Sequence, residues 1–531
     1  MNAAQVTNLA NLLASTARLF PDHPALIVGD RVWSWREIDA RVNAMVAALR
    51  SLGIRKGDKI LMQSRNNVQM FEFCWVAFRM GCVWVPTNFR LTPPEVAYLG
   101  ASSNAVAMVV EDIFPEHTDA VRAESSDLRH IISIGSPREG ECSYEALIEQ
   151  HRGAPAQPET VQASDPLWFF YTSGTTGKPK AGILSHDQMD FVVNNHLADL
   201  IPGTRETDRS IVVAPLSHGA GIHALVNVAR GAASILLPSE KFDPETFWQL
   251  VEQHRVTNLF TVPTIVKMLV EHPAVDQYDH SSLRYVIYAG APMYRADQKL
   301  ALQKLGKVLV QYFGLGEVTG NITVLPPHMH SADDNDPNAH IGSCGYVRTG
   351  MEIAILDEQG VERPRGEIGE ICARGPAVFE GYYGNPEATA KALRGGWFHT
   401  GDLGRMDERG LLYITGRESD MYISGGSNVY PREVEEVLLT HPGVAEIAIV
   451  GMPDSKWGEI GVAVVVRRPG PEPVDEAALL GFLEGRCAKY RWPRRFFFWD
   501  VMPKSGYGKI VKKDIKVMLI ERGDIEDPNL Q

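Results

Sequence analysis

Hydroxyl groups, glycines and lysines are concentrated in one short segment, residues 171–180, which reads YTSGTTGKPK. Glycine lets the backbone wrap closely around an anion, hydroxyl groups donate hydrogen bonds, and lysine adds positive charge. The segment therefore predicts a loop that holds phosphate groups, although taken alone it could be an ordinary solvent-exposed loop. The residues expected to contribute are Thr172, Ser173, Gly174, Thr175, Thr176, Gly177 and Lys178.

This segment differs from the common P-loop, because Thr172 stands at the place of its first glycine and Pro179 at the place of its Ser or Thr. The apolar runs 167–171 and 181–184 predict a strand on each side of the loop. No helix is then expected to begin at the loop, so a GTPase or kinase of the P-loop class is disfavoured.

Further segments place polar residues in glycine-containing turns: YAGAP at 288–292, QYFGLGE at 311–317, GWFHTGD at 396–402 and TGRESD at 415–420. Together with the loop, and in this order, they resemble the signature segments of the adenylate-forming superfamily. That superfamily contains acyl-CoA synthetases, luciferases and the adenylation domains of peptide synthetases. The resemblance extends over nearly the whole chain.

The resemblance implies a binding site for ATP and Mg²⁺. Glu317 is expected to help hold Mg²⁺, which prefers oxygen ligands, and Asp402 to accept hydrogen bonds from the ribose hydroxyls. Arg417 matches a ribose and phosphate contact. The other residues expected to contact the nucleotide are Gly290, Ala291, Pro292, Gln311, Tyr312, Phe313, Gly314 and Gly316.

Two positions in 311–317 depart from the family pattern. Phe313 stands where the family usually has Tyr, and Gly316 where it usually has a Thr whose hydroxyl meets the α-phosphate. If the loss of the threonine hydroxyl is the only consequence of having glycine at position 316, Gly316→Thr should raise the rate of adenylation. The alternatives are that glycine supplies a positive φ or room beside the acyl group.

The segment 503–510, PKSGYGKI, resembles the one that carries the mobile catalytic lysine of the family, so Lys509 is the expected catalytic cation. A cation there would stabilise charge that develops when a carboxylate attacks the α-phosphorus. Gly425 and Gly426 are expected to approach coenzyme A after the small C-terminal domain rotates. The basic residues around 489–516 are either a solvated face or a contact for the phosphates of coenzyme A.

Residues 214–221, APLSHGAG, match the segment that in amino-acid-activating relatives carries an Asp for the substrate amino group. The segment contains no Asp, so an amino-acid substrate is disfavoured. By resemblance, His218 lies at the carboxylate end of the acyl pocket and acts in catalysis. The small residues 219–221 leave space, with Val262 and Ile265 as apolar walls, so the pocket suits an uncharged acyl or aryl acid.

The elements that must position these residues follow an α/β pattern. Ser34 and Glu37 predict a capping box at the start of a helix over 34–49, and 59–62 predicts a strand. The helix-then-strand order recurs at 71–85, 247–261 and 296–312. We therefore expect an N-terminal adenylation domain over 1–417, β-rich from about 345, and a small α+β domain over 418–531 that begins with a helix at Pro431.

The composition limits the compartment and the partners. The chain has 531 residues and a net charge of −13, which disfavours nucleic acid as a partner. Its six cysteines form no CxxC pair and resemble neither a disulfide framework nor a zinc site. We find no signal segment and no apolar run of membrane-spanning length, so we expect a cytoplasmic protein.

These features predict a carboxylate:CoA ligase that forms acyl-AMP from an acid and ATP and then transfers the acyl group to coenzyme A. The expected partners are the acid, ATP, Mg²⁺ and coenzyme A, and a homodimer is left open. One alternative is an enzyme that stops at acyl-AMP or loads a carrier protein. A second alternative is a catalytically silent nucleotide-binding protein, and light emission of the luciferase kind is a remote third.

Overall fold

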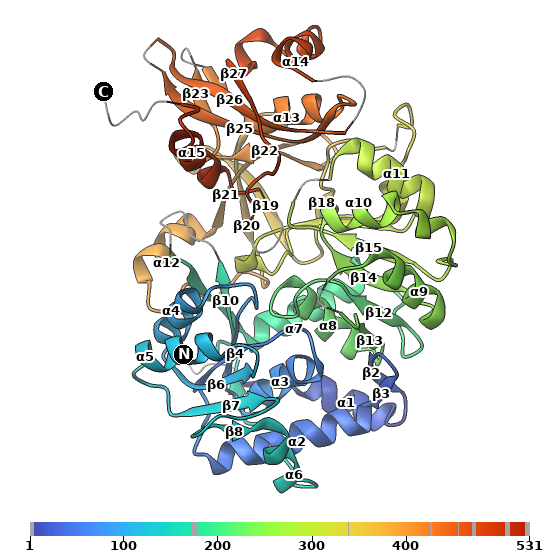
Figure 1. Ribbon diagram of the computed structural model, residues 1–531, viewed down its shortest axis with the longest axis vertical. Coiled ribbons are helices and arrows are strands. Elements are labelled where there is room, and N and C mark those ends of the chain that lie inside the picture. The colour runs from blue at the N-terminus through green and yellow to red at the C-terminus, as the bar shows by residue number, and fades with distance from the viewer. Residues whose placement is uncertain are drawn as a thin grey trace.

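The computed structural model describes residues 5–172, 178–239, 241–291, 293–337, 339–424, 427–454, 456–469, 474–504 and 510–525. Two large sheets form the lower part of the molecule in Figure 1, and a smaller part built from the C-terminal residues lies at the top. A third sheet lies between them. This arrangement confirms the predicted α/β class with a large N-terminal part and a small C-terminal part.

The first large sheet has the strand order β11-β10-β5-β4-β6-β7-β8. Its central strands are parallel, and β11 pairs antiparallel with β10 at one edge. The strands are β4 (Lys59–Gln63), β5 (Val83–Pro86), β6 (Ala105–Glu111), β7 (His130–Ile134), β8 (Cys142–Ser143), β10 (Pro166–Thr172) and β11 (Lys180–Ser185). The strands expected on both sides of residues 173–177 are thus confirmed.

The second large sheet has the order β18-β17-β16-β15-β14-β12-β13-β2-β3. Its strands are β2 (Pro24–Val28), β3 (Arg31–Ser34), β12 (Arg209–Val212), β13 (Ala233–Leu236), β14 (Asn258–Thr261), β15 (Tyr285–Tyr288), β16 (Leu309–Phe313), β17 (Thr323–Leu325) and β18 (Tyr346–Val347). Strands β12 to β16 are parallel, so their carboxyl ends share one edge.

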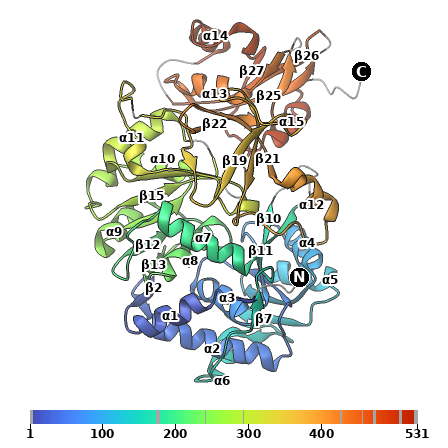
Figure 2. The same cartoon turned by 180° about the vertical axis from the view of Figure 1, so that it is seen from behind.

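Helices join the two sheets into one core. Helix α7 (His186–Asp199) contacts β11, helix α8 (Gly219–Val228) contacts β12, β13 and β14, and the two helices contact each other (Figure 2). Their buried residues belong to one hydrophobic cluster together with strands of both sheets. The two large sheets are therefore held in a fixed relation.

The predicted capping box and the predicted helix-then-strand order are both present in the structure. Helix α2 (Trp35–Ser51) begins after Ser34, whose hydroxyl and the Glu37 carboxylate form the predicted capping box. The helix-then-strand order appears as α3 (Val68–Arg79) with β5, α9 (Pro244–His254) with β14, and α11 (Arg295–Leu305) with β16. Helices α2 and α9 each bury one apolar face, whereas α3 is buried on all sides from Met70 to Arg79.

The third sheet consists of β19 (Glu352–Leu356), β20 (Gly369–Arg374), β21 (Phe398–Met406) and β22 (Leu412–Arg417), in that order. It is the predicted β-rich part. Strand β21 has an irregular register between its pairs with β20, and Gly401 within it has a φ of +71°. Such irregularities re-aim side chains, and this one lies directly before Asp402.

The C-terminal sheet is built from β23 (Tyr422–Ser424), β24 (Ser427–Val429), β25 (Val444–Asp454), β26 (Gly458–Arg467) and β27 (Arg495–Phe498). Helix α13 (Pro431–Leu439) begins at Pro431 as expected, and α14 (Glu476–Leu483) and α15 (Lys512–Glu521) complete this part. Among the helices of the described ranges, none combines the length and the apolar character needed to cross a membrane.

Candidate active site

A cavity of about 1850 Å³ lies at the carboxyl ends of the parallel strands. The residues that follow β12, β14, β15 and β16 line it, among them Ala214, Val262, Gly290 and Gly314. The end of β10 contributes Thr172 from the other large sheet. Ligands of open α/β sheets bind at this edge, because the loops there diverge and leave a crevice.

Several of the expected site residues line this cavity. They are Thr172, Lys178, His218, Gly290, Tyr312, Gly314, Gly316, Glu317 and Arg417. The structure thus brings together segments that are far apart in the sequence, from the phosphate loop to the end of the third sheet.

Glu317 is a buried acidic residue of the cavity wall, with 6% of its surface exposed. Its Oε1 accepts a hydrogen bond of 2.8 Å from the Thr172 hydroxyl and another of 2.8 Å from the Tyr382 hydroxyl. Burial and the Glu317 carboxylate raise the pKa of Tyr382, so this hydroxyl keeps its proton and remains a donor. The carboxylate is therefore held in one orientation by two elements of the fold.

Tyr382 was not expected from the sequence. It forms an isolated bridge with Gly182 of β11, and its ring packs against Phe379 and lies 4.8 Å from the Lys180 ammonium. Tyr382 therefore connects Glu317 to the strand that leaves the phosphate loop. Its place three residues before Asn385, the N-cap of helix α12 (Pro386–Ala392), was the available signal, but a tyrosine at a turn is too common to identify a site.

Gly316 begins the short helix η2 (Gly316–Val318), directly beside strand β10. A Cβ atom at this position would lie 2.7 Å from the Phe170 ring and 2.8 Å from the Thr172 methyl group. Real Cβ contacts are longer than this, so a side chain would force neighbouring atoms to move. The geometry favours the interpretation that glycine supplies room here.

Aromatic rings form a second region of the cavity. The Tyr312 and Phe260 rings stack with centroids 5.9 Å apart, and His218 meets the Phe170 ring edge-on at 4.4 Å. A Cβ atom at Gly219 would lie 2.8 Å from the Phe260 ring, so the small residue lets α8 approach that ring. Further apolar lining residues are Val213, Leu237, Val262 and Ile265.

A charged pair lies on another part of the cavity wall. The Arg65 guanidinium forms a salt bridge with Glu111, with an Nε to Oε1 distance of 3.0 Å. The two charges compensate each other, and Glu111 raises the pKa of Arg65 further above its ordinary value. Arg65 lies two residues after β4 and Glu111 is the last residue of β6, so no single segment of the sequence indicates this pair.

Asp402 and Arg417 face each other across strands β21 and β22. The Arg417 Nε lies 3.2 Å from the Asp402 Oδ1, and Asp402 is buried with 6% of its surface exposed. Arg417 is one of the residues that line the cavity, and Asp402 is not. The arginine thus presents positive charge to the cavity while the aspartate anchors it.

Other expected site residues lie outside the described lining of the cavity. Gln311 accepts a hydrogen bond of 3.1 Å from the Tyr288 hydroxyl, and Phe313 packs against the core of the third sheet. Ala291 directly follows Gly290 and is half-buried. Outside the described residues lie Lys509, Ser173, Gly174, Thr175, Thr176, Gly177, Pro292, Gly425 and Gly426.

The small C-terminal part also reaches the cavity. Val511 and Asp514, near the start of α15, line it. The neighbouring Lys512 ammonium lies 2.7 Å from Glu435 of α13. The chain that directly follows the expected catalytic lysine is therefore positioned at the cavity by contacts within the C-terminal part.

The comparisons with known proteins agree with this geometry. Residues 13–383 match the AMP-binding enzyme family, and residues 433–509 match the AMP-binding enzyme C-terminal domain. The chain therefore belongs to the AMP-binding enzymes, the adenylate-forming superfamily that the motifs resemble.

Two curated relatives are similar over almost their whole length. A feruloyl-CoA synthase of Amycolatopsis sp is 35% identical over 94% of this chain and 96% of the relative. An indoleacetate–CoA ligase of Aromatoleum aromaticum is 32% identical over 96% of this chain and 98% of the relative. Among solved structures, the anthranilate CoA ligase AuaEII in complex with anthranoyl-AMP has a TM-score of 0.88 at 25% identity and covers 98% of each chain.

Proposed function

We propose that this protein is an AMP-forming carboxylate:CoA ligase whose acid is an uncharged aryl or acyl acid. The observation that carries the proposal is one continuous cavity that joins a hydroxyl and carboxylate region, at Thr172 and Glu317, to an aromatic region, at Phe260 and Tyr312. The first region suits phosphates with a cation, and the second suits an apolar acid. Both substrates of an adenylation reaction thus have complementary surfaces in one space.

In the first reaction, a carboxylate oxygen of the acid attacks the α-phosphorus of ATP, and the bond from this phosphorus to the pyrophosphate oxygen breaks. In the second, the sulfur of coenzyme A attacks the acyl carbon, the bond from this carbon to the AMP oxygen breaks, and the thiol loses its proton. Lys509 would neutralise charge in the first transition state. Arg417, which lines the cavity, would attract the phosphate and ribose.

The residues at Glu317 fit a magnesium ion. Mg²⁺ prefers oxygen ligands, and the Glu317 carboxylate and Thr172 hydroxyl supply oxygens at the cavity wall. When bound, the ion would reduce the negative charge of the phosphates. Tyr382 and Thr172 would hold the Glu317 carboxylate in place through its Oε1.

The aromatic wall supports the choice of acid. Phe170, His218, Phe260 and Tyr312 present ring faces and edges, and an aryl acid would bury apolar surface against them. The two curated relatives are named for feruloyl and indoleacetate, which are both aryl-containing acids. A second carboxylate of a dicarboxylic acid would lose hydration against these rings, which costs free energy.

The test is carboxylate-dependent pyrophosphate release, measured with short, medium-chain, branched, aromatic and dicarboxylic acids. We expect the highest kcat/KM with an aryl or apolar acyl acid. A preference for a dicarboxylate would contradict the proposed pocket. Addition of free coenzyme A or of a carrier protein to the acyl-AMP complex then identifies the acceptor, and we expect thioester formation with coenzyme A.

The chain divides, in this proposal, between β22, which ends at Arg417, and β23, which begins at Tyr422. The part that follows would rotate between the two reactions and carry Lys509 away from the cavity. The segment containing Gly425 and Gly426 would then approach coenzyme A.

Tyr382→Phe should weaken the apparent affinity of the enzyme for Mg²⁺ without changing the fold. The substitution removes one of the two donors to Glu317 Oε1, so the carboxylate is held less firmly. We expect the Mg²⁺ concentration for half-maximal pyrophosphate release to rise about tenfold, as for other residues that orient metal ligands. The KM for the acid should not change.

The matched control is Tyr383→Phe, because the Tyr383 hydroxyl donates to Asn104 and not to Glu317. Identical Mg²⁺ titrations of the two variants would show that Tyr382 has no part in positioning the carboxylate.

Gly316→Thr should lower acyl-AMP formation with every acid, although it restores the hydroxyl that the family pattern has. The added side chain would overlap Phe170 and Thr172, and overpacking of this kind typically costs about 1–3 kcal/mol. Gly481→Thr in α14 is the control, because a Cβ atom there would meet no described atom within 4 Å apart from its chain neighbours and its own helix backbone. Single-turnover formation of acyl-AMP checks this, and a faster rate in Gly316→Thr would contradict it.

A further inference from the structure

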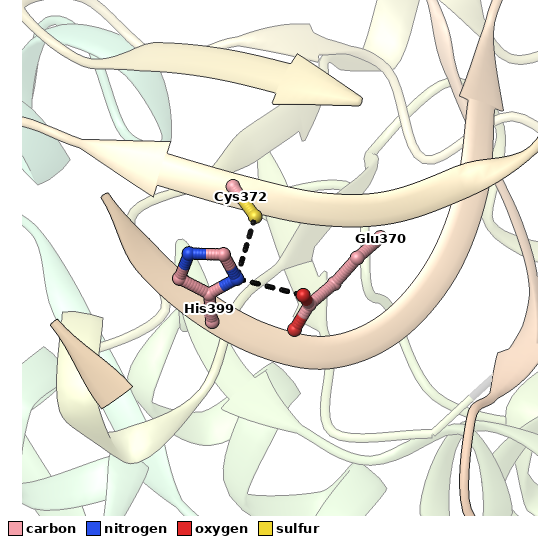
Figure 3. A group of neighbouring side chains, drawn as sticks. All are labelled: Glu370, Cys372 and His399. Carbon is pink, nitrogen blue, oxygen red and sulfur yellow. Dashed lines mark hydrogen bonds and ion pairs between the residues drawn. The ribbon is translucent and has the colours of Figure 1, made fainter. Parts of the chain in front are cut away.

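Three side chains of types that can bind metal ions lie close together in the third sheet, and none of them lines the cavity. Glu370 and Cys372 are two residues apart on β20, so they share one face of the strand, and Cys372 pairs with His399 on β21. Figure 3 shows the three side chains directed toward one another. Their arrangement follows from strand register and not from closeness in the sequence.

The ligand atoms of the three side chains converge. The His399 Nδ1 lies 2.7 Å from Glu370 Oε2 and 3.3 Å from Cys372 Sγ, and the three ligand atoms all lie within 4.8 Å of one another. The Nδ1 atom faces both neighbours, so it cannot donate its proton to the carboxylate and also accept one from the thiol. The thiol–imidazole contact is then left without an ordinary hydrogen bond whenever the imidazole donates to Glu370.

We propose that Glu370, Cys372 and His399 form a binding site for a zinc ion. Sulfur, imidazole nitrogen and carboxylate oxygen are the donors that Zn²⁺ takes in proteins. Bond lengths of about 2.3 Å to sulfur and 2.0–2.2 Å to nitrogen and oxygen require the donor atoms to be roughly 3.3–3.6 Å apart in a tetrahedron. To reach this geometry the His399 Nδ1 to Glu370 Oε2 distance of 2.7 Å would have to lengthen by about 0.7 Å, and water would supply the remaining ligand.

The surroundings of the cluster restrict access from solvent. The side chains of His399 and Glu370 are 7% and 15% exposed, and Cys372 packs beside Ala354 and Leu356. Burial, together with the Glu370 carboxylate, raises the pKa of the Cys372 thiol to about 12. Zinc binding would therefore release the thiol proton to solvent, and the two negative ligands would balance the charge of the ion.

Arg394 is the cation that competes for this position. Its guanidinium Nη2 lies 3.0 Å from Glu370 Oε2, and its side chain is half-exposed at 51%. A zinc ion would displace it, since both cations use the same carboxylate oxygen. Removal of the arginine charge should then strengthen zinc binding, an effect that a purely structural ion pair does not predict.

Zinc binding would affect the neighbouring nucleotide region. The Gly401 N–H donates a hydrogen bond of 3.1 Å to Glu370 Oε1, and Gly401 directly precedes Asp402. A metal ion bound to Glu370 would therefore change the hydrogen bond that this carboxylate accepts from the irregular part of β21. The zinc site itself does not depend on the proposed ligase function.

The test uses the full-length protein, first treated with a chelator and then titrated with zinc in competition with a chromophoric chelator. We expect about one equivalent in the wild type and affinity reduced on the order of tenfold or more in Cys372→Ser and in His399→Gln. Arg394→Ala should bind zinc more tightly than the wild type. Cys142→Ser on β8 is the control and should bind as the wild type does.

Circular dichroism of each variant confirms folding before titration, and His399→Gln provides the measurement if Cys372→Ser fails to fold. Zinc affinities equal to that of the wild type in Cys372→Ser or His399→Gln would overturn the proposal. An absence of zinc binding by the wild type, or weaker binding by Arg394→Ala, would overturn it as well.

Discussion

Lys509→Ala is expected to reduce acyl-AMP formation on the order of 100- to 1000-fold, which corresponds to about 3–4 kcal/mol of lost transition-state stabilisation. The reason is that carboxylate attack on the α-phosphorus brings two anions together, and a cation is most valuable at that moment. Thioester formation from supplied acyl-AMP should be unaffected, because that step occurs after pyrophosphate has left. Single-turnover assays of the two half-reactions check this difference.

Lys513→Ala is the matched control, since Lys513 is an exposed lysine of α15 close to the same segment. Nearly normal rates in this variant would exclude a general effect of lost positive charge. Equal losses in both half-reactions of Lys509→Ala would contradict the assigned role.

Glu317→Gln is expected to lower acyl-AMP formation about 100-fold or more while it preserves the fold. The amide oxygen still accepts hydrogen bonds from Thr172 and Tyr382, but the negative charge that attracts Mg²⁺ is lost. Increasing Mg²⁺ should partly restore the rate of pyrophosphate release. Thioester formation from supplied acyl-AMP should change little.

Glu380→Gln serves as the control, because Glu380 is exposed and belongs to the same segment as Tyr382. Thermal melting of all variants measures stability separately from activity. A rate for Glu317→Gln equal to that of the wild type, at limiting Mg²⁺, would exclude Glu317 as a metal ligand.

The phosphate-loop flanks and the order of the motifs could be predicted from the sequence. Strands β10 and β11 and helix α2 were recognisable, because each depends on residues within one short segment: an apolar run, or a capping box at Ser34 and Glu37. The segments around Glu317 and Arg417 were recognisable by resemblance for the same reason.

The sequence does not reveal why glycine, and not the threonine of the family pattern, stands at position 316. A missing hydroxyl and a lack of space predict opposite effects of Gly316→Thr, and the sequence is compatible with both. Which effect occurs depends on contacts of Gly316 with Phe170 and Thr172. Like the partners Thr172 and Glu317, which are 145 residues apart, these residues are far from Gly316 in the sequence. Only the packing of η2 against β10 brings these atoms together.

The sequence by itself thus determined the class of fold, the family and the candidate residues, because these depend on local spacing of residue types. Tertiary structure decided which of them share a space. It joined Tyr382 to Glu317, paired Asp402 with Arg417, and brought Cys372 and His399 together where the sequence contains no CxxC pair. Strand register and sheet packing set these contacts, and both arise from many weak long-range interactions that no single segment encodes.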